Sequence, residues 1–122
     1  MDIENISMSI ILQAGNAKKY LYEALKHARN AEFEQIETKM RLVSKELLKA
    51  HKLQTKLIQE DTKGELENLP ILLVHAQDHL MSVMSERSLV EEMIAMYSSQ
   101  NKLRKKVNCL VEGMNVGKKV DS

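Results

Sequence analysis

Residues Pro70–Met84, PILLVHAQDHLMSVM, decide the fold, because they combine a helix start with an apolar run that covers several helical faces. Proline is accepted in the first turn of a helix, where its missing N–H would have no intrahelical partner. The run is more apolar than two partner helices in one bundle would require. It predicts a third helix, continuing to about Leu103, that needs a further partner, and self-association is the simplest source.

Two earlier helices are expected on the N-terminal side of this run. Apolar residues recur every three and four positions from Ile3 to Ala28, and this first helix should start between Asp2 and Asn5. Gly15 interrupts it at a cost of about 1 kcal/mol relative to alanine. Such a glycine is expected either where a neighbouring backbone comes close or simply as a soft spot in the helix.

A second apolar seam predicts a helix over residues 31–60, with Gln54 as its one polar seam position. Asn30 is the expected break, and so short a connection makes the first two helices antiparallel neighbours. The segment Asp61–Asn68 has alternating charges and no apolar period, so it is expected to be a loop. The eight methionines follow apolar seams and are expected to pack in the core.

The composition favours an all-α fold in a single domain. The 122 residues are 43% hydrophobic, and they include no tryptophan, one phenylalanine and one proline, which leaves little material for β-structure. A chain of this length supports one hydrophobic core. We therefore expect a three-helix antiparallel bundle over residues 1–103.

Residues 104–122 are expected to form a basic tail with a frayed or irregular end, because Gly113 and Gly117 occur among many charges. From Lys102 onward the surplus is four positive charges, whereas the whole chain has a net charge of +1. A balance so close to zero argues against nucleic-acid binding by the chain as a whole. The basic residues are Lys102, Arg104, Lys105, Lys106, Lys118 and Lys119, against Glu112 and Asp121.

The sequence also indicates a cellular compartment. Cys109 is the only cysteine, so neither a disulfide framework nor a cysteine metal set is available, and a reducing cytoplasm fits. Asp2 and Glu4 stand where a signal peptide would carry positive charge, and no apolar run approaches the length of a membrane span. We expect a soluble, cytoplasmic protein without membrane insertion.

Inside the apolar third helix lies a polar cluster, His75-Ala76-Gln77-Asp78-His79. On an ideal helix His79 lies roughly 40° and Asp78 roughly 60° from His75, whereas Gln77 points nearly the opposite way. Imidazole is largely neutral near pH 7 and is a good nucleophile for phosphorus. His75 is therefore the candidate catalytic residue, and His79 and Gln77 are candidate supporting residues. The alternative for His75 is a histidine held by ordinary core hydrogen bonds.

Asp78 falls on a seam with Val74 and Met81, where a buried carboxylate must be paired, protonated or bound to a cation. If three copies of the helix met around an axis, their carboxylates would repel unless a hard divalent cation bound them. The alternatives are a lysine partner within the chain (Lys45, Lys52 or Lys56) and a zinc set of His75, His79 and Asp78, to which His51 could add a ligand.

The stretch Leu72–Met81, LLVHAQDHLM, resembles the signature of the lactose/cellobiose-specific IIA components of the bacterial phosphoenolpyruvate-dependent sugar phosphotransferase system. Further similarity lies in Ala50–Gln59, in Ala14–Ala17 and in Glu23–Leu25, and together it covers roughly residues 3–103. The sequence departs from the family pattern at Lys18-Lys19-Tyr20 and in the basic tail. These departures bear on partner choice and sugar class more than on chemistry.

The resemblance implies a fold of three antiparallel helices per subunit assembled into a homotrimer. It implies that His75 is the phosphorylated histidine and that Asp78 binds a metal, most simply Mg²⁺ shared between subunits on the trimer axis. The donor would be phospho-HPr, the general phosphocarrier, and the acceptor a cysteine on a IIB component that serves a membrane permease. The transported sugar would be a β-glycoside disaccharide of the lactose, cellobiose or chitobiose type.

A hypothesis from another class is a noncatalytic helical interaction module, in which the polar cluster only fixes the register of an oligomer. A zinc-site protein is the third hypothesis, and it lacks the His-Glu pair of a zinc hydrolase. Uptake of a phosphoryl group on His75 distinguishes the phosphocarrier from both.

Overall fold

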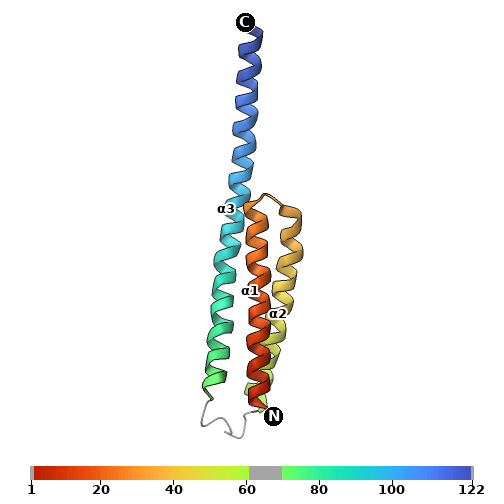
Figure 1. Ribbon diagram of the computed structural model, residues 1–122, viewed down its shortest axis with the longest axis vertical. Coiled ribbons are helices and arrows are strands. Elements are labelled where there is room, and N and C mark those ends of the chain that lie inside the picture. The colour runs from red at the N-terminus through yellow and green to blue at the C-terminus, as the bar shows by residue number, and fades with distance from the viewer. Residues whose placement is uncertain (1, 61–69, 122) are drawn as a thin grey trace.

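A computed structural model describes residues 2–60 and 70–121, with the side chains of residue 60 and of residues 116–121 outside that description. It contains three helices: α1 (Ile3–Arg29), α2 (Phe33–Glu60) and α3 (Ile71–Asp121). They run up, down and up, so that consecutive helices are antiparallel (Figure 1). No strand occurs in the described ranges, which confirms the all-α prediction.

The ends of α1 follow from local hydrogen bonds. The carboxylate of Asp2 accepts from the backbone N–H of Asn5 at 3.2 Å, which satisfies one of the free donors of the first turn and confirms the expected start. Asn30 is the C-cap, and the next residue, Ala31, has a φ of 59°, the left-handed conformation that commonly ends a helix. The break predicted at Asn30 is confirmed.

The start of α3 agrees with its expected position to within one residue. The carbonyl of Pro70 accepts from the N–H groups of Leu73 and Val74 at 3.0 and 3.2 Å, so Pro70 begins the hydrogen-bond ladder without needing an N–H of its own. The α2 helix ends at Glu60, as predicted. The loop expected over Asp61–Asn68 lies outside the described residues.

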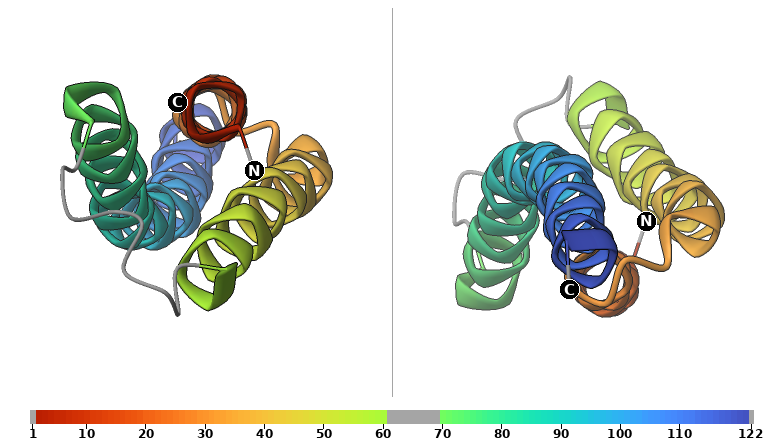
Figure 2. Two further views of the ribbon diagram at one scale, coloured as in Figure 1. Left: turned by 90° about the horizontal axis from the view of Figure 1, so that it is seen from below. Right: turned by 90° about the horizontal axis from the view of Figure 1, so that it is seen from above.

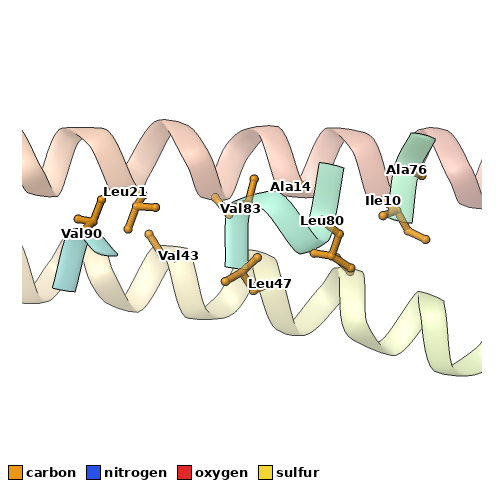
Figure 3. Close-up of a cluster of buried hydrophobic side chains, with 11 residues drawn as sticks. Ile10, Ala14, Leu21, Val43, Leu47, Ala76, Leu80, Val83 and Val90 are labelled. Carbon is orange, nitrogen blue, oxygen red and sulfur yellow. The ribbon is translucent and has the colours of Figure 1, made fainter. Parts of the chain in front are cut away.

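The α1 helix is the centre of the bundle. It packs along both α2 and α3, whereas α2 and α3 contact each other little (Figure 2). Its core face is rich in alanine, which lets the neighbouring helices come close, and leucine, isoleucine and valine fill the space between them (Figure 3). The buried cluster comprises Ile10, Ala14, Ala17, Leu21, Val43, Leu47, Ala50, Ala76, Leu80, Val83 and Val90.

The irregular C-terminal tail expected over residues 104–122 is not what the structure contains. α3 is helical for 51 residues, through Asp121, and it projects beyond the turn between α1 and α2 (Figure 1). The region holds no proline, and a helix tolerates Gly113 and Gly117 at about 1 kcal/mol each. Because the helix is already nucleated in the bundle, each added residue gains a hydrogen bond without a new nucleation step. We call residues 105–121 the stalk.

Candidate functional site

His75 lies on α3, in the second turn after the helix start, and its side chain is exposed. The ring of His79 follows one turn later, with the two ring centroids 6.3 Å apart and the planes inclined by 6°. His79 is half-buried. The helix thus presents two parallel imidazoles on one side, and the outer one is open to a docking protein. The sealed core histidine, which was the alternative, is not what the structure shows.

Asp78 is exposed in this chain, contrary to the expectation of a buried seam. The reason is that α3 packs on α1 with one side only, so the seam that carries Asp78 faces outward. Among the described residues no ion pair involves Asp78, and the proposed lysine partners Lys45 and Lys52 do not reach it. Its neighbours along the seam, Val74 and Met81, are exposed apolar side chains. The carboxylate therefore stands alone on an apolar surface.

Asp78 belongs to a continuous row of positions that we call the outer stripe. Steps of three and four residues carry it along one side of α3, within an arc of about 120° on a straight helix. Its apolar members are all exposed, from 43% at Met93 to 87% at Ile71. Its positions are Ile71, Val74, Asp78, Met81, Ser85, Leu89, Met93, Met96, Gln100, Leu103, Val107, Leu110 and Met114.

The exposure of this stripe corrects the expectation that the methionines pack in the core. Met81, Met93, Met96 and Met114 lie on the stripe and are between 43% and 70% exposed. The spacing of apolar residues was interpreted correctly as a helical face, but that face has no partner within the described part of the chain. The extra partner predicted from the width of the apolar run therefore stays a prediction.

Gln77 points away from His75, as its helical position predicts, and meets α2. Its Oε1 accepts a hydrogen bond from Nε2 of Gln54 at 2.5 Å, in a partly buried position. This pair explains the one polar position of the α2 seam. It connects α2 to the same turn of α3 that carries His75 and Asp78, so Gln77 can orient the helix but does not share the face of His75.

Two further contacts connect α3 to its neighbours. Arg87 donates to Oγ of Ser44 on α2 at 2.8 Å, and Nζ of Lys18 lies 3.8 Å from Oε1 of Glu86. Sequence reasoning did not identify Arg87, because nothing in the local pattern distinguishes it from a solvated surface residue. Lys18, one of the departures from the family pattern, thus pairs with α3.

Gly15 has no close neighbour in this chain. A Cβ added there would meet nothing within 4 Å among the described residues, so the expectation of a closely approaching backbone is wrong for the single chain. Nor do three histidine, cysteine, aspartate or glutamate side chains converge as a metal set within the described residues. The zinc set of His75, His79, Asp78 and His51 is therefore not assembled by one chain.

Comparison with known proteins identifies the family. The sequence model of the phosphotransferase-system lactose/cellobiose-specific IIA subunit matches residues 5–98. The lichenan-specific phosphotransferase enzyme IIA component of Bacillus subtilis is 38% identical over 96 residues, which are 79% of this chain and 87% of that protein. The N,N'-diacetylchitobiose-specific IIA component of Escherichia coli K12 is 36% identical, over 79% of this chain and 83% of that protein.

Solved structures agree with this comparison. The cellobiose-specific enzyme IIA of Bacillus anthracis superposes with a TM-score of 0.78 at 33% identity, covering 84% of this chain and 94% of that one. The IIA(chitobiose) of the E. coli IIA–HPr complex gives 0.73 at 34% identity, covering 83% and 98%. The chain belongs to the lactose/cellobiose-specific IIA family of the sugar phosphotransferase system, and it is thus a phosphotransferase component. The stalk lies beyond the family match.

Proposed function

We propose that His75 is the residue that carries the phosphoryl group in this IIA component. The observation that supports the proposal is an exposed imidazole on a rigid helix, one turn before a second, parallel imidazole. No acidic residue occupies the first turn of α3. The positive end of the helix, one turn before His75, therefore favours the negative charge that a phosphoryl group brings.

The chemistry consists of two displacements at phosphorus. A nitrogen lone pair of His75 attacks the phosphorus of the donor, the bond from phosphorus to the donor breaks, and its electron pair stays with the donor. In the second step the thiolate of the acceptor attacks, and the electron pair of the broken N–P bond returns to His75. His79 can donate a hydrogen bond to a phosphoryl oxygen and so hold the group for transfer.

HPr is the proposed donor, because a related IIA forms a complex with HPr in E. coli. A cysteine of a IIB component is the proposed acceptor. Relatives named for lichenan, N,N'-diacetylchitobiose and cellobiose favour a β-glycoside disaccharide as the transported sugar. Within the described residues, none of the helices has the length and apolarity to span a bilayer, and we place the protein in the cytoplasm with its partners.

The experiment is phosphorylation with phosphoenolpyruvate, enzyme I and HPr. The wild type should gain one acid-labile, base-stable phosphoryl group, and His75→Gln should gain none. His79→Gln should still be labelled, about tenfold more slowly, because one charge-assisted hydrogen bond is lost. His51→Gln is the matched control on α2 and should behave as wild type. Wild-type protein that takes up no phosphoryl group would favour the interaction module.

We also propose that three copies associate along the outer stripe and share a divalent cation, Mg²⁺ being the simplest, at Asp78. The support is the unpaired, exposed carboxylate in an apolar row, because a hard cation suits converging carboxylate oxygens. One chain supplies only one such carboxylate, so the site would form only between subunits. The cation would stabilise the assembly, and no step of the phosphoryl transfer passes through it.

Sedimentation at micromolar concentration tests this proposal. The wild type should be a trimer whose dissociation constant rises when the cation is removed by a chelator. Asp78→Leu should remain a trimer and lose that dependence, since three leucines replace three mutually repelling charges. Glu34→Leu, an exposed carboxylate on α2, is the control and should keep the dependence. A monomeric wild type at this concentration would contradict the proposal.

A further inference from the structure

The part of the outer stripe from Leu89 to Met114 has the period of a coiled coil. Its positions follow one another at alternating steps of four and three residues. This is the heptad repeat of a coiled coil, in which these residues occupy the two core positions. Seven of these eight positions are apolar and exposed in the single chain, for example Leu110 at 69%, and only Gln100 is polar. The eight positions are Leu89, Met93, Met96, Gln100, Leu103, Val107, Leu110 and Met114.

The described side chains of the stalk leave this apolar surface open to solvent in the single chain. Every described side chain from residue 102 to residue 115 is exposed, and this part of α3 extends past the end of the α1–α2 pair (Figure 1). At the base of the stalk, the side chains of Leu25, Met93, Met96 and Tyr97 line an apolar hollow beside the same stripe. A helix with a continuous apolar stripe and no partner in its own chain indicates association with another helix.

We propose that the partner is the same stripe of other copies of this chain, which makes the stalk a parallel homomeric coiled coil. The stripe in the stalk continues the row that contains Asp78, so copies that meet along the bundle also bring their stalks together side by side. A strict heptad matches a partner helix with the same repeat, and another copy supplies that repeat at the same height.

The charges beside the stripe fit parallel copies. In this arrangement the flanking positions of neighbouring helices pair as Glu92 with Tyr97, Ser99 with Arg104 and Lys106 with Val111, so none of the three pairs brings like charges together. Lys105 lies on the far side of α3 from Leu103, and Lys102 lies about 100° round the helix from it, so both would face solvent around the coiled coil.

Cysteine cross-linking in the full-length chain tests the contact and its direction. Cys109 is the only cysteine, is exposed, and falls on an outward heptad position, so it is replaced by serine. In that background, Val107→Cys places a thiol on the stripe and Asn108→Cys places one on the next residue, which points away. Mild oxidation should cross-link the Val107→Cys protein at least about tenfold faster, because core positions of parallel copies lie within disulfide distance. Equal rates, or no cross-link at Val107→Cys, would overturn the proposal.

Circular dichroism gives a second, independent readout. The double variant Leu103→Glu/Leu110→Glu should lose up to about a sixth of the helical signal, the share of the stalk, although glutamate is itself a good helix former. Asn108→Glu adds the same charge off the stripe and should keep the signal. A double variant with undiminished helix content would show that the stripe has no partner and would overturn the proposal.

The salt dependence of cross-linking tests whether the apolar stripe holds the copies together, and phosphorylation of the variants tests the stalk separately from the proposed function of His75. Because copies of a basic stalk repel one another, cross-linking of the Val107→Cys protein should increase with ionic strength. A decrease would overturn the proposal, because it would mean that attraction between opposite charges, and not the apolar stripe, holds the copies together. Residue 107 lies about 48 Å along α3 from His75. The stalk variants should therefore accept phosphoryl groups normally, and His75→Gln should cross-link normally when combined with Cys109→Ser/Val107→Cys.

Discussion

The helices α1 and α3 carry apolar residues at similar spacing but bury them to different extents. On α1 the seam residues Ile10 and Leu21 are fully buried, because the helix lies between two partners. On α3 the side that packs on α1 is buried, whereas the outer stripe, with Leu89 60% exposed, is largely uncovered in the described part of the chain. An apolar pattern therefore indicates how many faces of a helix need a partner. It does not indicate whether that partner belongs to the same chain.

The largest expected effect is on the free energy of unfolding, and it is tested with one leucine on each helix. Leu21→Ala should lower the free energy of unfolding by about 2–5 kcal/mol, because it empties a site that is fully enclosed. Leu89→Ala should cost less than about 1 kcal/mol in dilute protein, where copies are apart and the side chain is largely in water. Urea denaturation at several protein concentrations measures both.

Protein concentration separates the two causes. The cost of Leu21→Ala should hardly vary with concentration, since this residue packs within one chain. The cost of Leu89→Ala should grow as copies associate, because the leucine then loses contacts with a neighbour. Equal, concentration-independent losses would show that the two helices do not differ in the way argued here.

Much of the fold could be predicted from the sequence because its signals are local. The cap at Asp2, the break at Asn30 and the proline before α3 each act within one helical turn, and all three were located to within one or two residues. The stalk was missed for the same reason. Two glycines and a run of lysines indicated a helix end locally, while the heptad from Leu89 to Met114, visible only over several turns, indicated its continuation.

The site was predicted in part. The relative directions of His75, His79 and Gln77 follow from helical geometry, and the structure has them as expected. The burial of Asp78 could not be predicted, because burial depends on which helix lies opposite, and a single sequence does not state how far α2 and α3 stand apart. The Gln54–Gln77 hydrogen bond is a second example. The sequence shows each residue as a polar position on its own helix, but only the packing of α2 against α3 brings the two together.

A smaller effect on stability is expected from a substitution on the outward side of α1. Gly15→Ala should raise the free energy of unfolding by about 1 kcal/mol, because alanine is the better helix former and its Cβ enters open space. Gly113→Ala is the matched control, since its Cβ would also enter open space but lies in α3 beyond the bundle. It should change the unfolding of the bundle much less. A loss of stability at Gly15→Ala would mean that another copy packs its backbone against α1 there.

The smallest effect concerns the salt bridge that joins α1 to α2. Oε2 of Glu23 lies 2.6 Å from Nζ of Lys39, and this hydrogen bond holds the pKa of the Glu23 carboxyl below its ordinary value. A carboxyl whose pKa is lower in the folded state stabilises the fold above its unfolded pKa, and that contribution is lost as the pH falls through the folded value. Glu23→Gln should therefore flatten the acid side of the stability curve, by less than about 1 kcal/mol for a pair in contact with water.

The ion pair of Arg87 with Glu91 is the counterpart of this bridge within α3. Their side chains lie 3.0 Å apart at successive turns of one helix, so the pair joins no two elements. At pH 7, Glu91→Gln should lower the free energy of unfolding less than Glu23→Gln does, as urea denaturation would measure. If Glu91→Gln cost as much, the α1–α2 bridge would be no more than a surface ion pair. The tight attachment of α1 would then rest on its apolar seam alone.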